Sequence, residues 1–467
     1  MLPANDKGKQ TMKIRAEQGA FVRASTVILL ACGAALGSAC LVAGTDEPEG
    51  DAVDRAERGL GSSLAAYNVN ITDTSVSGLS SGAFFAGQLG VAFSSVIKGV
   101  GIVAGGTYDC AGQMSYTGCM YQSSPSVTAS IANTKSWSGS SLDAWANQAN
   151  QKIYMFSGSS DTTVATSVMD QVYKYYVTTG AFVPAANVTY KKDLKTVHTF
   201  PTDFDGAGNN LCTVPGAPYI SNCGFDGAGA ILQRIYGSLN PRNNGTLGGT
   251  FIQFSQSEFL ASPTSYGMDA AGWAYVPAAC ASGAQCKLHI AFHGCLQGYA
   301  KIGDKFVKNT GYNRWADTNN IIVLYPQAVA DTVNHSPSPS GAGANGNGCW
   351  DWVGYYGTDF DKKTGKQMST IKKMIDRVSS GYSGGSGGGS TDAGAPDSGG
   401  GSTDAGGFTP VCTTSSNYAH VQAGRAHDSG GYALANGSNQ NMGLNNLFYS
   451  KTLKQTGTNY YEIGTCP

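Results

Sequence analysis

Charge is what this sequence has least of. Its 467 residues include 30 Lys and Arg against 31 Asp and Glu, so that 13% of the chain is charged and the net charge is −1. An average soluble protein has about 25% charged residues. No basic cluster forms an electrostatic footprint for nucleic acid, and we expect no nucleic-acid partner. A weakly charged surface suits a protein that meets an insoluble neutral substrate, although an ordinary secreted protein fits the composition equally well.

A C-x-x-C pair is absent among the 12 cysteines. This absence argues against a zinc site or a redox motif, and we expect neither a metal nor another cofactor. Ten cysteines follow residue 44, and they fall in close pairs, which favours disulfides formed in an oxidising compartment. Pairing nearest neighbours predicts Cys110–Cys119, Cys212–Cys223, Cys280–Cys286, Cys295–Cys349 and Cys412–Cys466.

The sequence also lacks a long hydrophobic run. The apolar stretch 25–36 follows five basic residues and precedes small residues, which is typical of a secretory signal and short for a membrane span. We therefore expect residues 1–44 to be a signal peptide and the chain to be a secreted monomer without a membrane span. Cys32 and Cys40 each lie in a loose lipoprotein cleavage pattern, so lipid anchoring is the alternative.

Residues 383–407 are almost entirely Gly, Ser, Asp, Thr and Ala, and GGGSTDAG at 387–394 returns at 399–406. Such a segment cannot bury apolar surface and is predicted to be a flexible linker. It separates a large unit, 66–382, from a small one, 408–467. Residues 45–65 are expected to be a short disordered segment.

The large unit alternates strand-like and helix-like segments, which predicts an α/β fold with a parallel sheet covered on both faces. Strands are expected at 69–76, 100–105, 152–156, 288–292 and 321–325, and helices at 83–93, 167–178 and 370–378. The small unit has no helical period. We therefore expect an all-β module. Because about 60 residues rarely form a sufficient hydrophobic core, we expect the disulfide Cys412–Cys466 to close it.

The segment Gly78–Gly82 has the pattern G-x-S-x-G, with a strand-like run before it and a helix-like run after it. This context is typical of a nucleophile elbow, in which a serine sits on a strained strand-to-helix turn and both glycines avoid clashes. Ser80 is therefore the candidate nucleophile. The alternative is an ordinary loop in a glycine-rich chain.

A serine hydroxyl needs a base and an acid that orients the base. His198 follows a strand-like stretch in a loop and is the candidate base, whereas His289 alternates with apolar residues inside a strand and is best explained as a packing residue. Asp161 follows the strand 152–156 and is the candidate acid. The aspartates closer to His198 in sequence are typical turn residues: Asp193, Asp203 and Asp205.

His293–Gly294–Cys295 follows another expected strand. A turn of this kind in α/β-hydrolases supplies one backbone N–H to the oxyanion, and the residue after the nucleophile supplies the other. This assigns Cys295 and Ser81 as donors. A rival hypothesis makes Cys295 a thiol nucleophile with His293, but adjacent residues are poorly placed for that chemistry.

In ordinary α/β-hydrolases the oxyanion turn precedes the nucleophile, whereas here it follows Ser80 by more than two hundred residues. Circular permutation is the simplest explanation. It predicts that the ends of the large unit, near Ala66 and Val378, are neighbours in space.

Four stretches resemble extracellular poly(3-hydroxybutyrate) depolymerases, in particular the branch with a circularly permuted catalytic domain. They are SVSGLSSGAFFAGQLGVAFS, HTFPTDFDGAGNN with SNCGFDGAGA, KLHIAFHGCLQGY, and NRWADTNNIIVLYPQ with GCWDW. The resemblance implies the triad Ser80, Asp161 and His198, oxyanion donors Ser81 and Cys295, and a substrate-contacting tryptophan, preferably Trp352. A buried structural role for that tryptophan is the alternative. The segment 411–467 resembles C-terminal modules of secreted hydrolases, which implies polymer binding.

The leading hypothesis is a secreted serine esterase that hydrolyses poly(3-hydroxybutyrate) or a related polyhydroxyalkanoate, with an insoluble polyester as its partner. The alternative enzyme is a feruloyl or acetyl esterase acting on plant polysaccharide. A non-catalytic surface-binding protein is the third hypothesis, and the intact candidate triad argues against it.

Overall fold

The computed structural model describes residues 62–121, 123–335, 338–383, 411–429, 432–438, 440–446, 449–457 and 460–464. The expected signal peptide, most of the N-terminal segment, nearly all of the linker and Cys466 lie outside the described residues. The chain divides into two compact units, Met1–Ser386 and Gly387–Pro467.

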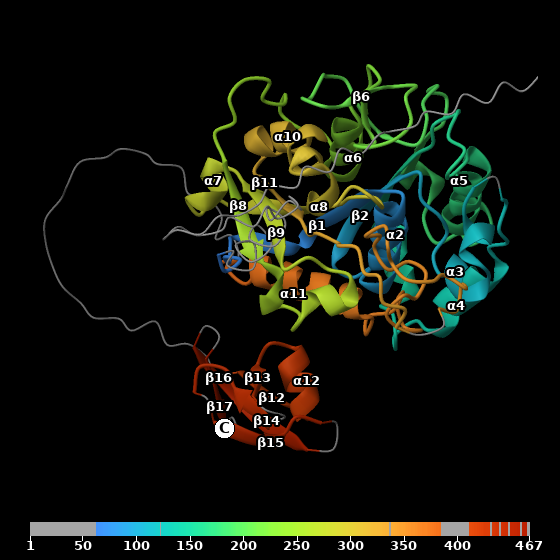
Figure 1. Cartoon of the computed structure of the whole chain (residues 1–467). Coiled ribbons are helices and arrows are strands. Elements are labelled where there is room, and N and C mark those ends of the chain that lie inside the picture. The colour runs from blue at the N-terminus through green and yellow to red at the C-terminus, as the bar shows by residue number, and fades with distance from the viewer. Residues whose placement is uncertain are drawn as a thin grey trace, which may run out of the picture. The chain divides into compact units, whose positions relative to one another are not determined.

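An eight-stranded sheet forms the centre of the larger unit (Figure 1). Its strands, in spatial order, are β4 (Val188–Lys191), β3 (Lys152–Phe156), β2 (Ile97–Val103), β1 (Val69–Leu79), β10 (Cys286–Phe292), β11 (Ile321–Tyr325), β9 (Ala271–Val276) and β8 (Thr250–Ser255). The first six are parallel, which confirms the expected α/β fold.

The last two strands, β9 and β8, are antiparallel and close one edge of the sheet. The sequence pattern predicts no strand at either position. Most side chains of β8 are only partly buried, because an edge strand has one neighbour and one covered face. Its hydrophobic pattern is correspondingly weak.

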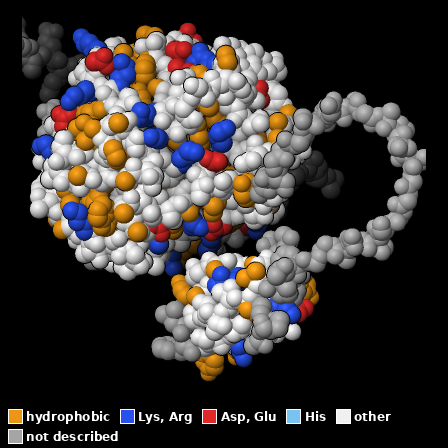
Figure 2. Space-filling model, turned by 180° about the vertical axis from the view of Figure 1, so that it is seen from behind, with side chains coloured by type: hydrophobic (Ala, Val, Ile, Leu, Met, Phe, Trp, Pro, Cys, Tyr) orange, Lys and Arg blue, Asp and Glu red, His pale blue; other side chains and the backbone are white. Residues whose placement is uncertain are grey.

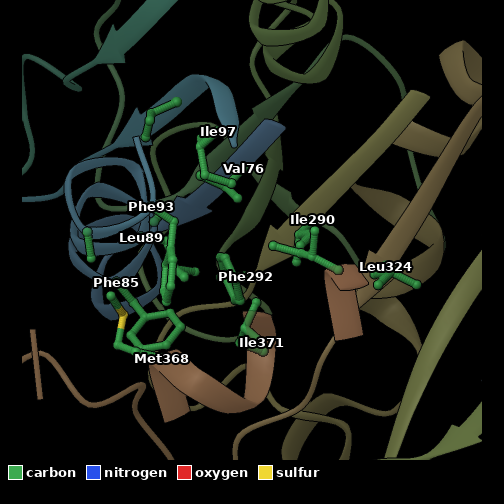
Figure 3. Packing of buried hydrophobic residues seen from close by; sticks show 14 of the residues in the cluster. Val76, Phe85, Leu89, Phe93, Ile97, Ile290, Phe292, Leu324, Met368 and Ile371 are labelled. Atoms are coloured by element: carbon green, nitrogen blue, oxygen red, sulfur yellow. The ribbon is translucent and has the colours of Figure 1, made fainter. Parts of the chain in front are cut away.

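Helices cover both faces of this sheet (Figure 1). Helices α2 (Ser81–Ala92) and α11 (Lys366–Ser379) pack on one face, and α6 (Gly227–Tyr236) and α10 (Tyr312–Asn319) pack on the other. Alternate strand residues point to opposite faces. Ile290 and Phe292 of β10 therefore join the core beside α2 and α11, where they meet Phe85, Leu89 and Met368 (Figure 3).

The remaining elements of this unit are short. They include α3 (Cys110–Gln113), α4 (Thr128–Ser136), α5 (Thr166–Tyr173), α7 (Ala278–Ala281), α8 (Tyr299–Ile302), α9 (Lys305–Asn309) and a small sheet of β5 (Phe200–Thr202), β7 (Ile220–Asn222) and β6 (Asn210–Leu211), besides several single 3-10 turns. A π-helical turn, Lys174–Thr178, continues α5, so the helix expected over 167–178 is present.

The two ends of the described larger unit lie side by side, as circular permutation predicts. The Tyr67 backbone N–H donates to the Val378 carbonyl over 2.8 Å, and the Ser383 N–H donates to the Asn68 side chain over 3.2 Å. Strand β1, which carries the candidate nucleophile, thus begins beside the place where α11 ends. It is the first strand of the sheet along the chain although it lies inside the sheet.

Four of the five expected disulfides are present: Cys110–Cys119, Cys212–Cys223, Cys280–Cys286 and Cys295–Cys349. Cys412 is also disulfide-bonded, and its expected partner Cys466 lies outside the described residues. Nearest-neighbour pairing is therefore confirmed wherever the structure describes both cysteines.

The smaller unit contains two antiparallel three-stranded sheets, as expected for a β module. One comprises β12 (Val411–Ser416), β16 (Ser450–Gly457) and β17 (Tyr460–Ile463), and the other comprises β13 (Ala426–Ser429), β14 (Tyr432–Ala435) and β15 (Asn441–Leu444). The structure adds one short helix, α12 (Asn417–Gln422), whose first turn is capped by the Ser416 hydroxyl. The buried Asn417 side chain of this helix donates to two backbone carbonyls, of Met442 and Leu444.

Among the described residues, none of the helices combines the length and the apolar character that crossing a membrane requires. Charged side chains on the face shown in Figure 2 are scattered among wide uncharged areas, as the low content of charged residues predicts.

Candidate active site

Ser80 occupies the turn between β1 and α2, with φ 56° and ψ −124°. This positive φ is strained for a residue with a side chain. Its backbone N–H donates to the Val103 carbonyl at the end of β2 over 3.0 Å. The turn is therefore fixed between two strands, and Ser80 is held at the carboxyl end of the sheet.

The two glycines of the turn are required by close backbone approaches. A Cβ atom on Gly78 would lie 2.3 Å from the Gly82 carbonyl group, and one on Gly82 would lie 2.4 Å from the carbonyl oxygens of Phe292 and His293. The second contact is informative because Phe292 ends β10. Gly82 thus lets the end of β10 approach the start of α2, which brings the segment 293–295 beside Ser80.

Asp161 and His198 meet although 37 residues separate them. The His198 Nδ1 atom lies 2.7 Å from the Asp161 Oδ2 atom, and the Asp161 side chain is 1% exposed. The other carboxylate oxygen, Oδ1, accepts backbone N–H bonds from Thr163 at 2.8 Å and Val164 at 2.9 Å. These bonds orient the carboxylate toward the ring, so that Nδ1–H donates to it and Nε2 is left on the opposite side of the imidazole.

Three of the candidate residues line one pocket of about 230 Å³. Ser80, His198 and Cys295 all line it. The other lining residues are Leu79, Met120, Tyr121, Thr163, Tyr219, Gly294, Leu296, Gln297 and Asn347. Ser81, the first residue of α2, is buried directly behind Ser80. One concave site therefore holds a serine, an acid-oriented histidine and the turn expected to bind an oxyanion.

The turn after β10 is held from several sides. The Gly294 N–H donates to the Gln297 side-chain oxygen over 2.6 Å, and the Leu296 N–H donates to the Asn347 carbonyl over 2.8 Å. Cys295 is bonded to Cys349. Because its sulfur is in a disulfide, the rival hypothesis of a Cys295 thiol nucleophile is wrong.

Gln297 connects this turn to the opposite wall of the pocket. Its side chain is fully buried, and its Nε2 atom donates to the carbonyls of Pro218 at 2.7 Å and Tyr219 at 3.1 Å. The Tyr219 ring faces the His198 ring edge-on, with 6.4 Å between centroids. One amide side chain thus ties the turn to the segment that packs against the candidate base.

Trp352 does not line this pocket. The residue is 6% exposed, and its ring stacks on Phe84 of α2 with 4.0 Å between centroids. Asp351 shapes the segment, since its carboxylate accepts backbone N–H bonds from Gly354, Tyr355 and Tyr356. Burial raises the pKa of Asp351 to about 6. A substrate contact by Trp352 stays a prediction, and the packing observed is that of the structural alternative.

The other histidines described in the larger unit do not line the pocket. His289 is fully buried in β10 and bonds Ser75 and Ser77, as expected of a packing residue, and desolvation lowers its pKa to about 3. His293 is also buried, and desolvation lowers its pKa to about 4. His335 pairs with Asp331 over 2.6 Å and does not line the pocket.

Several lining residues have no role predicted from the sequence, and Tyr121 is the most unusual of them. Its φ is 61°, its side chain is 46% exposed, and its backbone is bonded to Thr163 and Ala165 of the acid loop. A signal was present nevertheless. Every missed residue except Thr163 lies close to, or within, a disulfide-closed segment: Met120 and Tyr121 follow Cys119, Tyr219 lies between Cys212 and Cys223, Leu296 and Gln297 follow Cys295, and Asn347 precedes Cys349.

Two curated proteins match most of this chain. A polyhydroxybutyrate depolymerase of Talaromyces funiculosus is 53% identical over 323 residues, which cover 69% of this chain and 94% of that protein. A poly(3-hydroxybutyrate) depolymerase of Delftia acidovorans is 44% identical, and the match covers 88% of this chain and 96% of that protein. This chain belongs to the polyhydroxybutyrate depolymerase family.

Other comparisons agree with this assignment. A poly(3-hydroxybutyrate) depolymerase of Ralstonia pickettii is 72% identical over 60 residues, which cover 13% of this chain and 12% of that protein. The crystal structure of the PHB depolymerase from Penicillium funiculosum has a TM-score of 0.66 and 52% identity, and the match covers 69% of this chain and all of that one. A serine-to-alanine PHB depolymerase complexed with an R3HB trimer matches equally well. A scan against protein-family models found no match.

Proposed function

We propose that this chain is a serine esterase that hydrolyses ester bonds of poly(3-hydroxybutyrate) or a related polyhydroxyalkanoate through an acyl-enzyme on Ser80. The observation that carries the proposal is the pocket shared by Ser80, His198 and Cys295 in a chain of the PHB depolymerase family. A structural relative at 52% identity is complexed with an R3HB trimer, which supports a 3-hydroxybutyrate ester as the substrate.

In the proposed mechanism Ser80 Oγ attacks the ester carbonyl while His198 Nε2 takes its proton. Asp161, already bonded to Nδ1 at 2.7 Å, holds the ring and stabilises the imidazolium. The backbone N–H groups of Ser81 and Cys295 stabilise the oxyanion of the tetrahedral intermediate. His198 then protonates the leaving alkoxide oxygen, which becomes the hydroxyl end of the released polymer, and a water activated by the same histidine hydrolyses the acyl-enzyme. No cofactor is needed for these steps.

A film-clearing assay tests the proposal. Purified protein should clear poly(3-hydroxybutyrate) films and release 3-hydroxybutyrate or its oligomers, whereas ferulate esters should not be cleaved. Ser80→Ala and His198→Ala should each lower the rate more than a thousandfold while leaving the fold intact, because triad members act as a unit. Turnover by Ser80→Ala above a thousandth of the wild-type rate would identify a different nucleophile.

We further propose that residues 66–382 form the catalytic domain, that 383–407 form a linker and that 408–467 bind the polymer surface. Exposed tyrosines support the last assignment: Tyr418, Tyr432 and Tyr449 are 43%, 46% and 52% exposed. A tethered module raises the local concentration of enzyme at a surface without changing the chemistry. A chain cut within 383–407 should therefore hydrolyse p-nitrophenyl butyrate normally but degrade films more slowly. A separate 408–467 fragment that does not adsorb to polymer granules would disprove the assignment.

We also propose that the protein is exported and that it is a monomer. Four disulfides within the described residues support an oxidising compartment. Reducing the purified protein should lower its melting temperature, and the expected signal peptide predicts that activity accumulates in the culture medium. Activity found in a membrane fraction would instead favour the lipoprotein alternative at Cys32 or Cys40.

A further inference from the structure

His293, the first residue after β10, has both ring nitrogens in hydrogen bonds. Its Nε2 atom lies 3.0 Å from the Ala328 backbone N–H, and its Nδ1 atom lies 2.7 Å from the Gly294 carbonyl oxygen. A backbone amide can only donate and a carbonyl can only accept. The two partners therefore specify one tautomer, in which Nε2 is bare and Nδ1 carries the proton.

The surroundings keep this ring neutral and immobile. His293 is fully buried, and the rings of Trp350 and Phe306 lie 5.6 Å and 6.0 Å from it. Burial lowers its pKa to about 4, so the ring does not take up a proton near neutral pH. His293 is thus a fixed hydrogen-bond donor to Gly294, unlike His198, which must gain and lose a proton.

The bond to Gly294 determines where the next N–H points. The Gly294 carbonyl and the Cys295 N–H belong to one peptide group. Within the residues that the structure describes, the one cis peptide is Ala217–Pro218, so the 294–295 peptide is trans. In a trans peptide the C=O and N–H point in opposite directions. A carbonyl held against the buried ring of His293 turns the Cys295 N–H away from that ring, and Cys295 lines the catalytic pocket.

We propose that His293 is a positioning residue for the oxyanion hole, whose Nδ1–H fixes the 294–295 peptide so that the Cys295 N–H is aimed at the developing oxyanion. This inference rests on the proposed function, which makes Cys295 a donor. A second, longer bond reaches the same carbonyl, from the Gln297 backbone N–H at 3.3 Å. Loss of His293 should therefore loosen the peptide without abolishing the turn.

Two substitutions separate the two bonds of the ring. His293→Asn keeps a donor at the position of Nδ1–H and loses the acceptor for Ala328. His293→Gln keeps an acceptor near the position of Nε2 and loses the donor to Gly294. Removal of a whole oxyanion donor costs about 100- to 1,000-fold in kcat. For p-nitrophenyl butyrate we expect His293→Gln to lower kcat roughly 10- to 100-fold with KM changed less than about threefold, and His293→Asn to stay within a few-fold of wild type.

His289→Gln is the matched control, since His289 is equally buried, in the strand that leads to His293, but makes no bond to the turn. It should destabilise the protein and leave kcat per folded molecule unchanged. Rates are normalised to the folded fraction, measured by near-ultraviolet circular dichroism, so that poor folding of either His293 variant does not mask the result. Equal kcat values for the Asn and Gln variants, or a lower value for Asn, would overturn the inference. An inactive wild-type protein would instead refute the proposed function.

Discussion

At the scale of single residues, part of the pocket wall has a strained backbone. Ser80, Tyr121, Tyr219 and Leu296 have φ between 54° and 61°, and all four line the pocket. Such conformations cost about 1–3 kcal/mol each and persist where surrounding structure enforces them. At Tyr121 the enforcing bonds come from the acid loop, so an exposed aromatic ring is held at the pocket in a backbone conformation that favours glycine.

Tyr121 therefore gives an unusual prediction. Glycine normally destabilises a site by about 0.5–1 kcal/mol relative to alanine, but here the positive φ should reverse the order. We expect Tyr121→Gly to have a free energy of unfolding equal to or above that of Tyr121→Ala in urea titrations. Both variants should lose kcat/KM on a 3-hydroxybutyrate trimer, whereas Tyr121→Phe should retain it. A Gly variant clearly less stable than the Ala variant would show that the conformation is not enforced.

At the scale of elements, the decisive contact is between the start of α2 and the end of β10. Gly82 allows it, because its hydrogen occupies the space where a Cβ would lie 2.4 Å from two carbonyl oxygens of β10 and the following turn. The strand that carries the nucleophile and the strand that carries the oxyanion turn are parallel neighbours. Their close approach is what the proposed pair of oxyanion donors, Ser81 and Cys295, requires.

Replacing Gly82 by Ala should push the end of β10 away from α2. We expect the free energy of unfolding to fall by roughly 3 kcal/mol, and kcat to fall as well because Cys295 moves with the strand. Gly87 is the control within the same helix, since a Cβ there meets nothing within 4 Å. Gly87→Ala should raise the free energy of unfolding by up to about 1 kcal/mol. Equal stabilities of the two variants, measured by urea unfolding, would contradict this reading of the contact.

The buried His289 of strand β10 makes the stability of the protein depend on pH. Burial lowers the pKa of His289 to about 3, whereas the unfolded chain binds this proton near pH 6.5. As pH falls below 6.5 the unfolded state takes up the proton first, so stability supplied by neutral His289 is present at pH 7 and decreases toward pH 3. The amount by which the free energy of unfolding of wild type exceeds that of His289→Gln should decrease by about 2 kcal/mol when the pH falls from 7 to 5. A difference independent of pH would show that His289 is not neutral in the folded state. Comparing the two proteins cancels the opposite effect of Asp351, whose pKa burial raises to about 6.

At the scale of the whole molecule, residues near the two ends of the larger unit lie next to each other, so its chain could begin at a different loop. The Tyr67 backbone N–H donates a hydrogen bond to the Val378 carbonyl over 2.8 Å. The loop before β8 is anchored separately: Asp317 accepts N–H bonds from Gly248 and Gly249 and one from the Asn243 side chain. Both sites are therefore secured by bonds that do not depend on chain continuity.

This arrangement predicts that a new permutation is tolerated. A protein with Ser383 joined to Ala65 by a short Gly/Ser linker and opened between Asn244 and Gly245 should fold and keep kcat on p-nitrophenyl butyrate within a few-fold of the 65–383 fragment. Opening the acid loop between Ser159 and Ser160 is the control and should abolish activity, because Asp161 loses its fixed position. An inactive, unfolded 244/245 permutant would mean that the unit depends on its present connectivity.

The sequence by itself determined those features that depend on neighbours along the chain. A glycine-flanked Ser80 between a strand pattern and a helix pattern specified the elbow, the core strands β3 and β11 were predicted at their observed bounds, and close spacing specified the four observed disulfides. The order of the motifs along the chain predicted that the ends would meet. These signals are local, or follow from order alone.

Only the tertiary structure decided what distant segments do to one another. It brought Asp161 to His198, packed Trp352 against Phe84 and gave β8 and β9 their antiparallel direction. It also made His293 a neutral donor and joined Gln297 to Tyr219 across the pocket. Burial, tautomer and direction depend on atoms supplied by segments tens to hundreds of residues away, and no pattern within one segment contains that information.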